Sequence, residues 1–130
     1  MSFAMGRMAD IEMPFRALPE HELRIADVAY LSAVRNSEFD AADYICGAPD
    51  LVVEVLSPSN TASELLDKES LCLENGAKEF WVVDPIRRQA KVSTVGGRTQ
   101  TWKSGQEIPL PLFGAGARLS VDAIFGSTAL

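Results

Sequence analysis

Two acidic residues stand where the sequence pattern predicts the inside of a β-sheet. Residues 50–56 (DLVVEVL) are predicted to form a strand that is apolar on both faces, with Glu54 among the apolar side chains of one face. Residues 23–31 (LRIADVAYL) place Asp27 between apolar residues in the same way, because alternate residues of a strand share a face. A carboxylate in such a place costs several kcal/mol unless a cation or hydrogen-bond donors meet it. Both residues therefore need a partner.

A divalent cation is one such partner. If the strands carrying Asp27 and Glu54 pair, both carboxylates can converge on one point. Mg²⁺ and Mn²⁺ favour oxygen ligands, so converging carboxylates predict a site for either ion. The alternative is that the two carboxylates accept hydrogen bonds from loop amides, or pair with an arginine such as Arg24 or Arg35.

A lysine on the following helix is the third candidate. Glu64, Lys68 and Cys72 follow one another at four-residue intervals and therefore lie along one face of a helix. A helix that crosses over from the strand bearing Glu54 can present Lys68 towards that carboxylate. An ammonium beside bound metal and a scissile phosphate can stabilise developing charge or orient a water. The alternative is a Glu64–Lys68 surface pair worth a few tenths of a kcal/mol.

The elements that would position these residues follow from the pattern of apolar residues and of turn residues. Besides the strands at 23–31 and 50–56, we expect a first strand at 8–18 that is interrupted or ended at Pro14, an irregular or briefly helical connection at 34–49, a helix at 62–74, a buried strand at 79–83, a hairpin at 88–103 turning at Gly96-Gly97, and a short strand and helical turn at 118–125. Strand, helix and strand between residues 50 and 83 indicate a right-handed crossover unit with parallel strands. Phe80 and Trp81 are expected in the core.

Composition fits one folded domain over residues 1–130. Apolar residues make up 47% and charged residues 23%, as in ordinary globular proteins. No apolar run approaches the roughly 20 residues of a membrane helix, and the start does not have the pattern of a secretory signal. The two cysteines, Cys46 and Cys72, lack metal-ligand spacing and fit reduced thiols in a cytoplasmic protein.

Charge is unevenly distributed along the chain. The net charge is −6, yet residues 78–103 carry six basic and two acidic side chains, a local charge of +4. An acidic chain does not bind a polyanion over its whole surface, but this basic stretch could contact phosphates. The alternative is a solvated hairpin.

Three segments, taken in order, resemble the Uma-two family, bacterial endonucleases of the PD-(D/E)XK, restriction-endonuclease-like superfamily. They are residues 24–30 (RIADVAY), 48–59 (APDLVVEVLSPS) and 76–85 (GAKEFWVVDP), with Lys68 between the second and the third. The resemblance covers roughly residues 20–125 and is densest from 48 to 85. It implies an α/β fold with a restriction-endonuclease-like mixed β-sheet core and a crossover helix, the amino-terminal part being shortened relative to the family.

The resemblance also implies roles for individual residues. Asp27 and Glu54 would bind Mg²⁺ or Mn²⁺, with the backbone carbonyl of Val55 as a further candidate ligand. Lys68 would be the family's lysine displaced onto the helix, because Leu56 occupies the superfamily's usual lysine position. Asp50 and Glu64 are possible supporting carboxylates. The implied chemistry is metal-assisted hydrolysis of a DNA phosphodiester.

The sequence also allows functions other than that of a nuclease. The main alternative is a non-catalytic, truncated protein of the same fold that acts by oligomerisation or DNA binding; a homodimer would cover apolar surface left by the shorter amino terminus. A serine hydrolase is poorly supported, because the chain has a single histidine, His21, in a polar turn and no Gly-x-Ser-x-Gly elbow.

Overall fold

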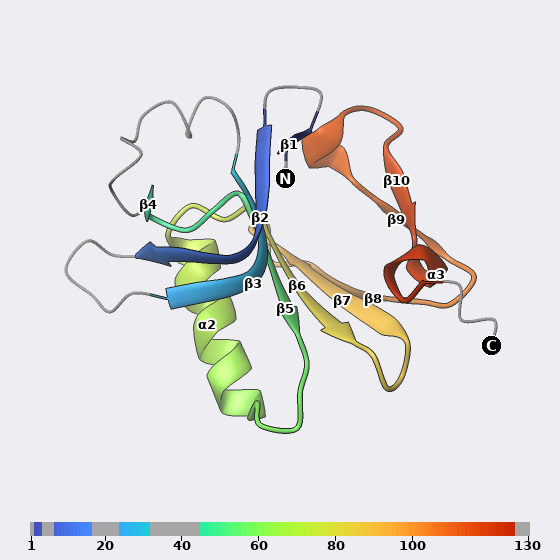
Figure 1. Cartoon of the computed structure of the whole chain (residues 1–130), viewed down its shortest axis with the longest axis horizontal. Coiled ribbons are helices and arrows are strands. Elements are labelled where there is room, and N and C mark those ends of the chain that lie inside the picture. Colours follow the sequence, from blue (N-terminus) through green and yellow to red (C-terminus); the bar gives the residue numbers. More distant parts are fainter. Residues whose placement is uncertain (1, 4–6, 17–23, 32–44, 127–130) are drawn as a thin grey trace.

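A computed structural model of the chain describes residues 2–3, 7–16, 24–31 and 45–126, and gives side-chain surroundings for residues 29–30 and 47–126 (Figure 1). The polar turn around His21 and most of the predicted connection, with Arg35, lie outside the described residues, as do the side chains of Arg24 and Asp27. None of the described helices is both long enough and apolar enough to span a bilayer.

The described part of the chain forms a mixed sheet of eight strands and a separate pair of short strands. The main sheet runs in the order β1 (Ser2–Phe3), β2 (Arg7–Arg16), β3 (Arg24–Leu31), β5 (Leu51–Val55), β6 (Glu79–Asp84), β7 (Gln89–Thr94) and β8 (Thr99–Lys103), with β4 (Ile45–Cys46) pairing in parallel with β2. β5 and β6 are also parallel, and every other neighbouring pair of the main sheet is antiparallel. β5 therefore lies inside the sheet, as its two apolar faces predicted.

The first long strand corrects one prediction. Pro14 neither interrupts nor ends it, because β2 runs from Arg7 to Arg16 and Pro14 pairs with Ile25 of β3. Proline lacks the N–H that a strand with two neighbours would need at that point. On the other side of β2, β1 pairs near its start and β4 at Phe15 and Arg16, so the pairing on that side does not include Pro14.

The helix between the parallel strands has the predicted bounds. α2 spans Ala62–Glu74 and begins with a capping box, in which the Thr61 hydroxyl accepts from the backbone N–H of Glu64 and the Glu64 carboxylate accepts from the backbone N–H of Thr61. Asn75 caps the carboxyl end of the helix, and Gly76 follows with a φ of 119°, a conformation that glycine adopts without strain.

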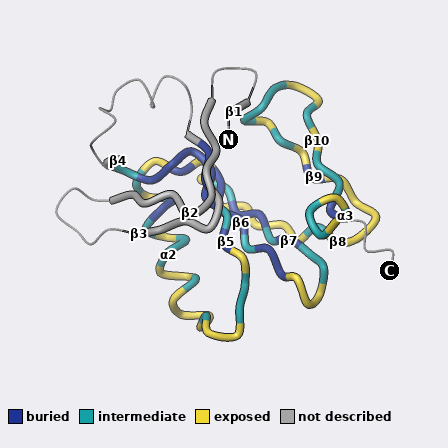
Figure 2. Tube along the Cα trace, in the orientation of Figure 1, coloured by how far each residue is buried: buried dark blue, intermediate teal, exposed yellow. Residues whose placement is uncertain are grey.

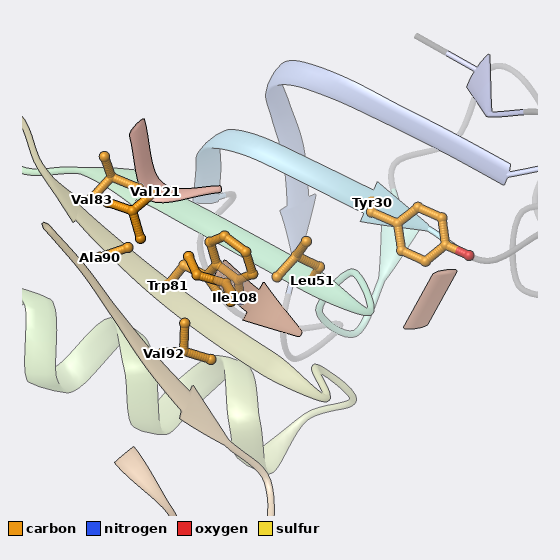
Figure 3. Close-up of a cluster of buried hydrophobic side chains, with 8 residues drawn as sticks. All are labelled: Tyr30, Leu51, Trp81, Val83, Ala90, Val92, Ile108 and Val121. Atoms are coloured by element: carbon orange, nitrogen blue, oxygen red, sulfur yellow. The ribbon is translucent and has the colours of Figure 1, made fainter. Parts of the chain in front are cut away.

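Each face of the sheet is covered by a different layer (Figures 1 and 2). α2 packs on one face, over a cluster of fully buried residues: Ala29, Ala48, Val52, Cys72, Ala77 and Phe80. The other face is covered by the carboxyl-terminal segment, which comprises β9 (Glu107–Pro109), the 3₁₀ turn Pro111–Phe113, β10 (Arg118–Ser120) and α3 (Val121–Ile124). The cluster beneath it contains Tyr30, Leu51, Trp81, Val83, Ala90, Val92, Ile108 and Val121 (Figure 3).

The buried aromatic residues and the hairpin agree with the sequence predictions. Phe80 is fully buried on the α2 face, and Trp81 is 3% exposed on the opposite face. β7 and β8 form the antiparallel hairpin, with Gly96 and Gly97 in its turn; Gly97 has a φ of 88°. The strand and helical turn near the end are β10 and α3. β9 was not predicted, because three residues that include Pro109 carry too little alternation to indicate a strand.

Candidate active site

Glu54 is a buried carboxylate inside the sheet. It lies on β5, which is hydrogen-bonded to β3 on one side and β6 on the other, and only 7% of the residue is exposed. Since Val52 belongs to the cluster under α2, strand alternation places Glu54 on the α2 face as well. The same alternation identified Glu54 in the sequence as a carboxylate that needs a partner.

Lys68 of α2 supplies that partner. Its Nζ lies 3.0 Å from Oε2 of Glu54, and the side chains of Lys68 and Glu54 are 18% and 9% exposed. Cys72, one turn further along the helix, is completely buried in the core cluster. The face of α2 that carries both residues is therefore the face docked on the sheet, and the crossover brings Lys68 to Glu54. Whether the pair is catalytic stays a prediction.

The position of Asp27 follows from strand register. β3 and β5 are antiparallel, with Val28 opposite Val53 and Ala29 opposite Val52. Continuing this register by one residue places position 27 opposite position 54, and opposed positions of an antiparallel pair lie on the same face of a sheet. The side chain of Asp27 lies outside the described residues, so its convergence with Glu54 stays a prediction. Within the residues whose side chains are described, no group of three His, Cys, Asp or Glu could hold a metal ion.

Asp50 and Glu64 have other contacts. The Nζ of Lys78 lies 3.3 Å from Oδ2 of Asp50, which is 2% exposed. Asp50 precedes Glu54 by four residues, a separation of roughly 13 Å along an extended strand. Glu64 is exposed and closes the capping box with Thr61. These contacts give each carboxylate a structural task, and a supporting role at the site stays a prediction for both.

A pocket of about 290 Å³ lies on the same face of the sheet, next to α2. Val82 pairs with Glu54 across β5 and β6 and also lines this pocket. The other lining residues are Leu56, Ala62, Leu65, Leu66, Glu69, Asp84, Gln89 and Lys91. Lys91 thus brings one positive charge of the basic stretch to the face that carries Glu54 and Lys68.

The rest of the basic stretch is dispersed. Arg87 is 2.9 Å from Oδ2 of Asp84, and Arg88 lies over the ring of Phe125 at 5.1 Å from its centroid. Several contacts lower the pKa of the Asp84 carboxyl. The largest effect comes from the hydrogen bond that the backbone N–H of Arg87 donates to it, and the Arg87 guanidinium and the backbone N–H of Ile86 add to that effect. The local charge of +4 therefore does not form one phosphate-binding surface.

One buried carboxylate escaped the sequence analysis. Glu79 opens β6, is 7% exposed and accepts a hydrogen bond of 2.8 Å from Nε1 of Trp81. Burial raises the pKa of its carboxyl, and the bond from Trp81 partly opposes that rise. The alternation that singled out Glu54 also applies here, because Glu79 shares a face with Trp81 and Val83. Glu79 was not singled out because it is the first residue of the strand, where a charged side chain is usually exposed.

Known proteins resemble the chain in sequence and in fold. The family model Uma2, described as "Putative restriction endonuclease", matches residues 3–122. A solved structure described as a putative nuclease belonging to DUF820, from Anabaena variabilis, superposes with a TM-score of 0.76 at 21% identity. The alignment covers 93% of this chain and 69% of that one. No curated protein matches the sequence. The mixed sheet with its crossover helix thus has the restriction-endonuclease-like fold.

Proposed function

The chain belongs to the Uma2 family, and from this premise we propose that it is a Mg²⁺-dependent endonuclease that hydrolyses phosphodiester bonds in DNA. The observation that carries the proposal is the buried contact between Glu54 on the central strand and Lys68 on the crossover helix, 3.0 Å apart. A carboxylate and an ammonium at the inner face of a sheet, beside a pocket, are the groups that metal-assisted phosphodiester hydrolysis needs.

The donor set fits a hard divalent cation. Glu54 and Asp27, with the backbone carbonyl of Val55 at the end of β5, would offer oxygen atoms only. An ionised carboxylate has about four acceptor sites on its two oxygens, so Glu54 can contact Lys68 and still bind a cation. When bound, Mg²⁺ would polarise the phosphoryl oxygen and lower the pKa of an attacking water.

Lys68 has two tasks in this proposal. Without a cation, its ammonium balances the charge of the buried Glu54 carboxylate. With substrate present, the same ammonium stabilises the charge that develops on the phosphate or orients the attacking water. Lys91, in the adjacent pocket, can contact a neighbouring phosphate and so help to position the strand.

The test is cleavage of plasmid and single-stranded DNA in the presence of Mg²⁺ or Mn²⁺. We expect cleavage that stops with EDTA and that is lost in Glu54→Gln and in Asp27→Ala. Glu74→Gln is the matched control, because Glu74 is an exposed carboxylate at the far end of α2. This variant should cleave DNA like the wild type. Cleavage that persists in Glu54→Gln and in EDTA would refute the proposal.

A thermal-shift measurement separates the enzyme from a non-catalytic protein of the same fold. Mn²⁺ or Mg²⁺ should raise the melting temperature of the wild type, and Asp27→Ala should abolish the rise. No rise in the wild type, with no cleavage, would favour the non-catalytic alternative. The homodimer and the cytoplasmic location stay predictions; sedimentation equilibrium tests the dimer.

A further inference from the structure

A second cavity lies on the face of the sheet opposite to Glu54 and Lys68. It has a volume of about 350 Å³, in the range of small-molecule sites. Its floor comes from β6, β7 and β8, and its other wall comes from the carboxyl-terminal segment between Ile108 and Arg118. Most of the lining is apolar, including the half-buried indole of Trp102 and the side chains of Val92, Ile108 and Leu110.

A buried acceptor sits on the floor of this cavity. Glu79 lines it and is more than nine-tenths buried, with Oε1 accepting from the indole N–H of Trp81. No side chain in the described part of the chain donates to Oε2 of Glu79 or forms a salt bridge with it. A buried carboxylate oxygen without a donor is costly, and a ligand that brings an N–H group would satisfy it.

Two arginines line the same cavity. Arg98 directly precedes β8 and Arg118 is the first residue of β10, and both residues are exposed. Neither guanidinium forms a salt bridge with any residue that the structure describes. A ligand in this cavity would therefore meet an acceptor at its buried end and fixed positive charge at its exposed end. Arginine is well suited to bind phosphate at such a position.

We propose that this cavity binds a single nucleotide whose base carries an exocyclic amino group, with the amino group donating to Glu79 and the phosphate bound by Arg98 and Arg118. Trp102 offers an aromatic surface against which a base can stack. A carboxylate can accept a hydrogen bond from the N4 amino group of cytosine. Uracil has a carbonyl oxygen, O4, at the same position, and two acceptors cannot form a hydrogen bond with each other. The site lies on the other face of the sheet from Glu54, so the proposal does not rest on the nuclease function.

Calorimetric titration with two matched pairs of nucleotides tests the proposal. CMP is compared with UMP, and AMP with IMP, because each pair differs mainly by an amino group replaced by a carbonyl. We expect the amino-bearing member of at least one pair to bind at least about tenfold more tightly. A ten-residue oligothymidylate is compared with the same strand ending in one cytidylate, to separate a free nucleotide from the end of a strand.

Variants assign the contacts. Glu79→Gln keeps an oxygen for the Trp81 N–H but offers an amide N–H₂, so the preference for CMP over UMP should disappear or reverse. Arg118→Ala should weaken binding of CMP but not of cytidine, whereas Lys103→Ala, an exposed cation outside the cavity, should change neither. Ala115→Trp places a large side chain in the exposed part of the lining and should abolish binding without altering Glu79.

The outcomes are separable from those of the nuclease proposal. A preference for the amino-bearing base that Glu79→Gln removes supports the site, even in a protein that cleaves no DNA. Equal affinity for both members of each pair and for both strands, or no binding of any of them, overturns it. A preference that survives Glu79→Gln or Ala115→Trp also overturns it.

Discussion

Replacing Lys68 with methionine should be much more costly than replacing any exposed lysine. Two unit charges 3.0 Å apart attract by about 5.5 kcal/mol at an effective dielectric constant of about 20. Removing one partner of a fully buried pair costs about 3–5 kcal/mol, because the other charge stays buried. Since 18% of the Lys68 side chain is exposed, water can partly solvate Glu54, and we expect Lys68→Met to lower the free energy of unfolding by about 2–3 kcal/mol.

The assay is urea unfolding of the metal-free protein, with Lys103→Met as the matched control. Lys103 is exposed and forms no salt bridge with any residue that the structure describes. Its replacement leaves no buried carboxylate without its cation, so Lys103→Met should cost less than about 1 kcal/mol. In the Lys68→Met background, adding Glu54→Gln should restore part of the lost stability, because the unbalanced charge is removed with its partner.

Metal binding provides the second measurement on the same variant. Removing the ammonium next to Glu54 removes a repulsive charge, so Lys68→Met should bind Mn²⁺ more tightly than the wild type while losing cleavage. Equal unfolding costs for Lys68→Met and Lys103→Met would refute the argument that removing Lys68 leaves a buried charge behind. Wild-type cleavage by Lys68→Met would refute the catalytic role proposed for Lys68.

Three further changes test the fold around the two sites. Thr61→Ala removes the hydroxyl half of the α2 capping box and should cost about 1 kcal/mol in urea unfolding, whereas Ser63→Ala, at an exposed position two residues later, should cost much less. Asp84→Ala removes the acceptor of two turn N–H groups and should lower the free energy of unfolding by about 1–3 kcal/mol at neutral pH. Because the pKa of Asp84 is lowered in the folded protein, this difference in stability should shrink only as pH falls below the ordinary aspartate pKa of 3.8. Glu79→Gln should have a higher melting temperature than the wild type at neutral pH. Burial raises the pKa of Glu79, so its charge destabilises the fold at pH values above the ordinary glutamate pKa of 4.5. The difference in melting temperature should vanish below that pH, and a difference that stays constant with pH would contradict the argument.

Strand alternation and turn residues carried most of the fold prediction. The bounds of α2 follow from a capping threonine, a helical run and a terminal Asn-Gly, all of which are local signals. β5 and β6 follow from apolar runs of the length of a strand. The course of β2 through Pro14 could not be predicted, because it depends on where β1 and β4 pair along the same strand, which is a tertiary property.

The candidate site was predictable to the extent that burial conflicts with charge. Glu54 was identified by that conflict, and Lys68 by four-residue spacing along a helix that had to cross the sheet. Glu79 presents the same conflict, yet its partner is the indole of Trp81 on its own strand and its cavity is closed by residues 108–118, far along the sequence. No local pattern indicates that a distant segment will cover a strand end.

If Lys68 acts in cleavage as proposed, its position on a helix makes activity depend on the docking of α2. A lysine two residues after Glu54 would be held by the strand, but Leu56 stands there and lines the pocket beside Leu65 and Leu66. With the cation on a helix, its distance from Glu54 depends on how α2 packs, and that packing is anchored one turn away by the buried Cys72. Loosening this anchor, for example with Cys72→Gly, should therefore lower cleavage before it unfolds the sheet, because a misplacement of about 1 Å at a reacting centre can cost a hundredfold in rate.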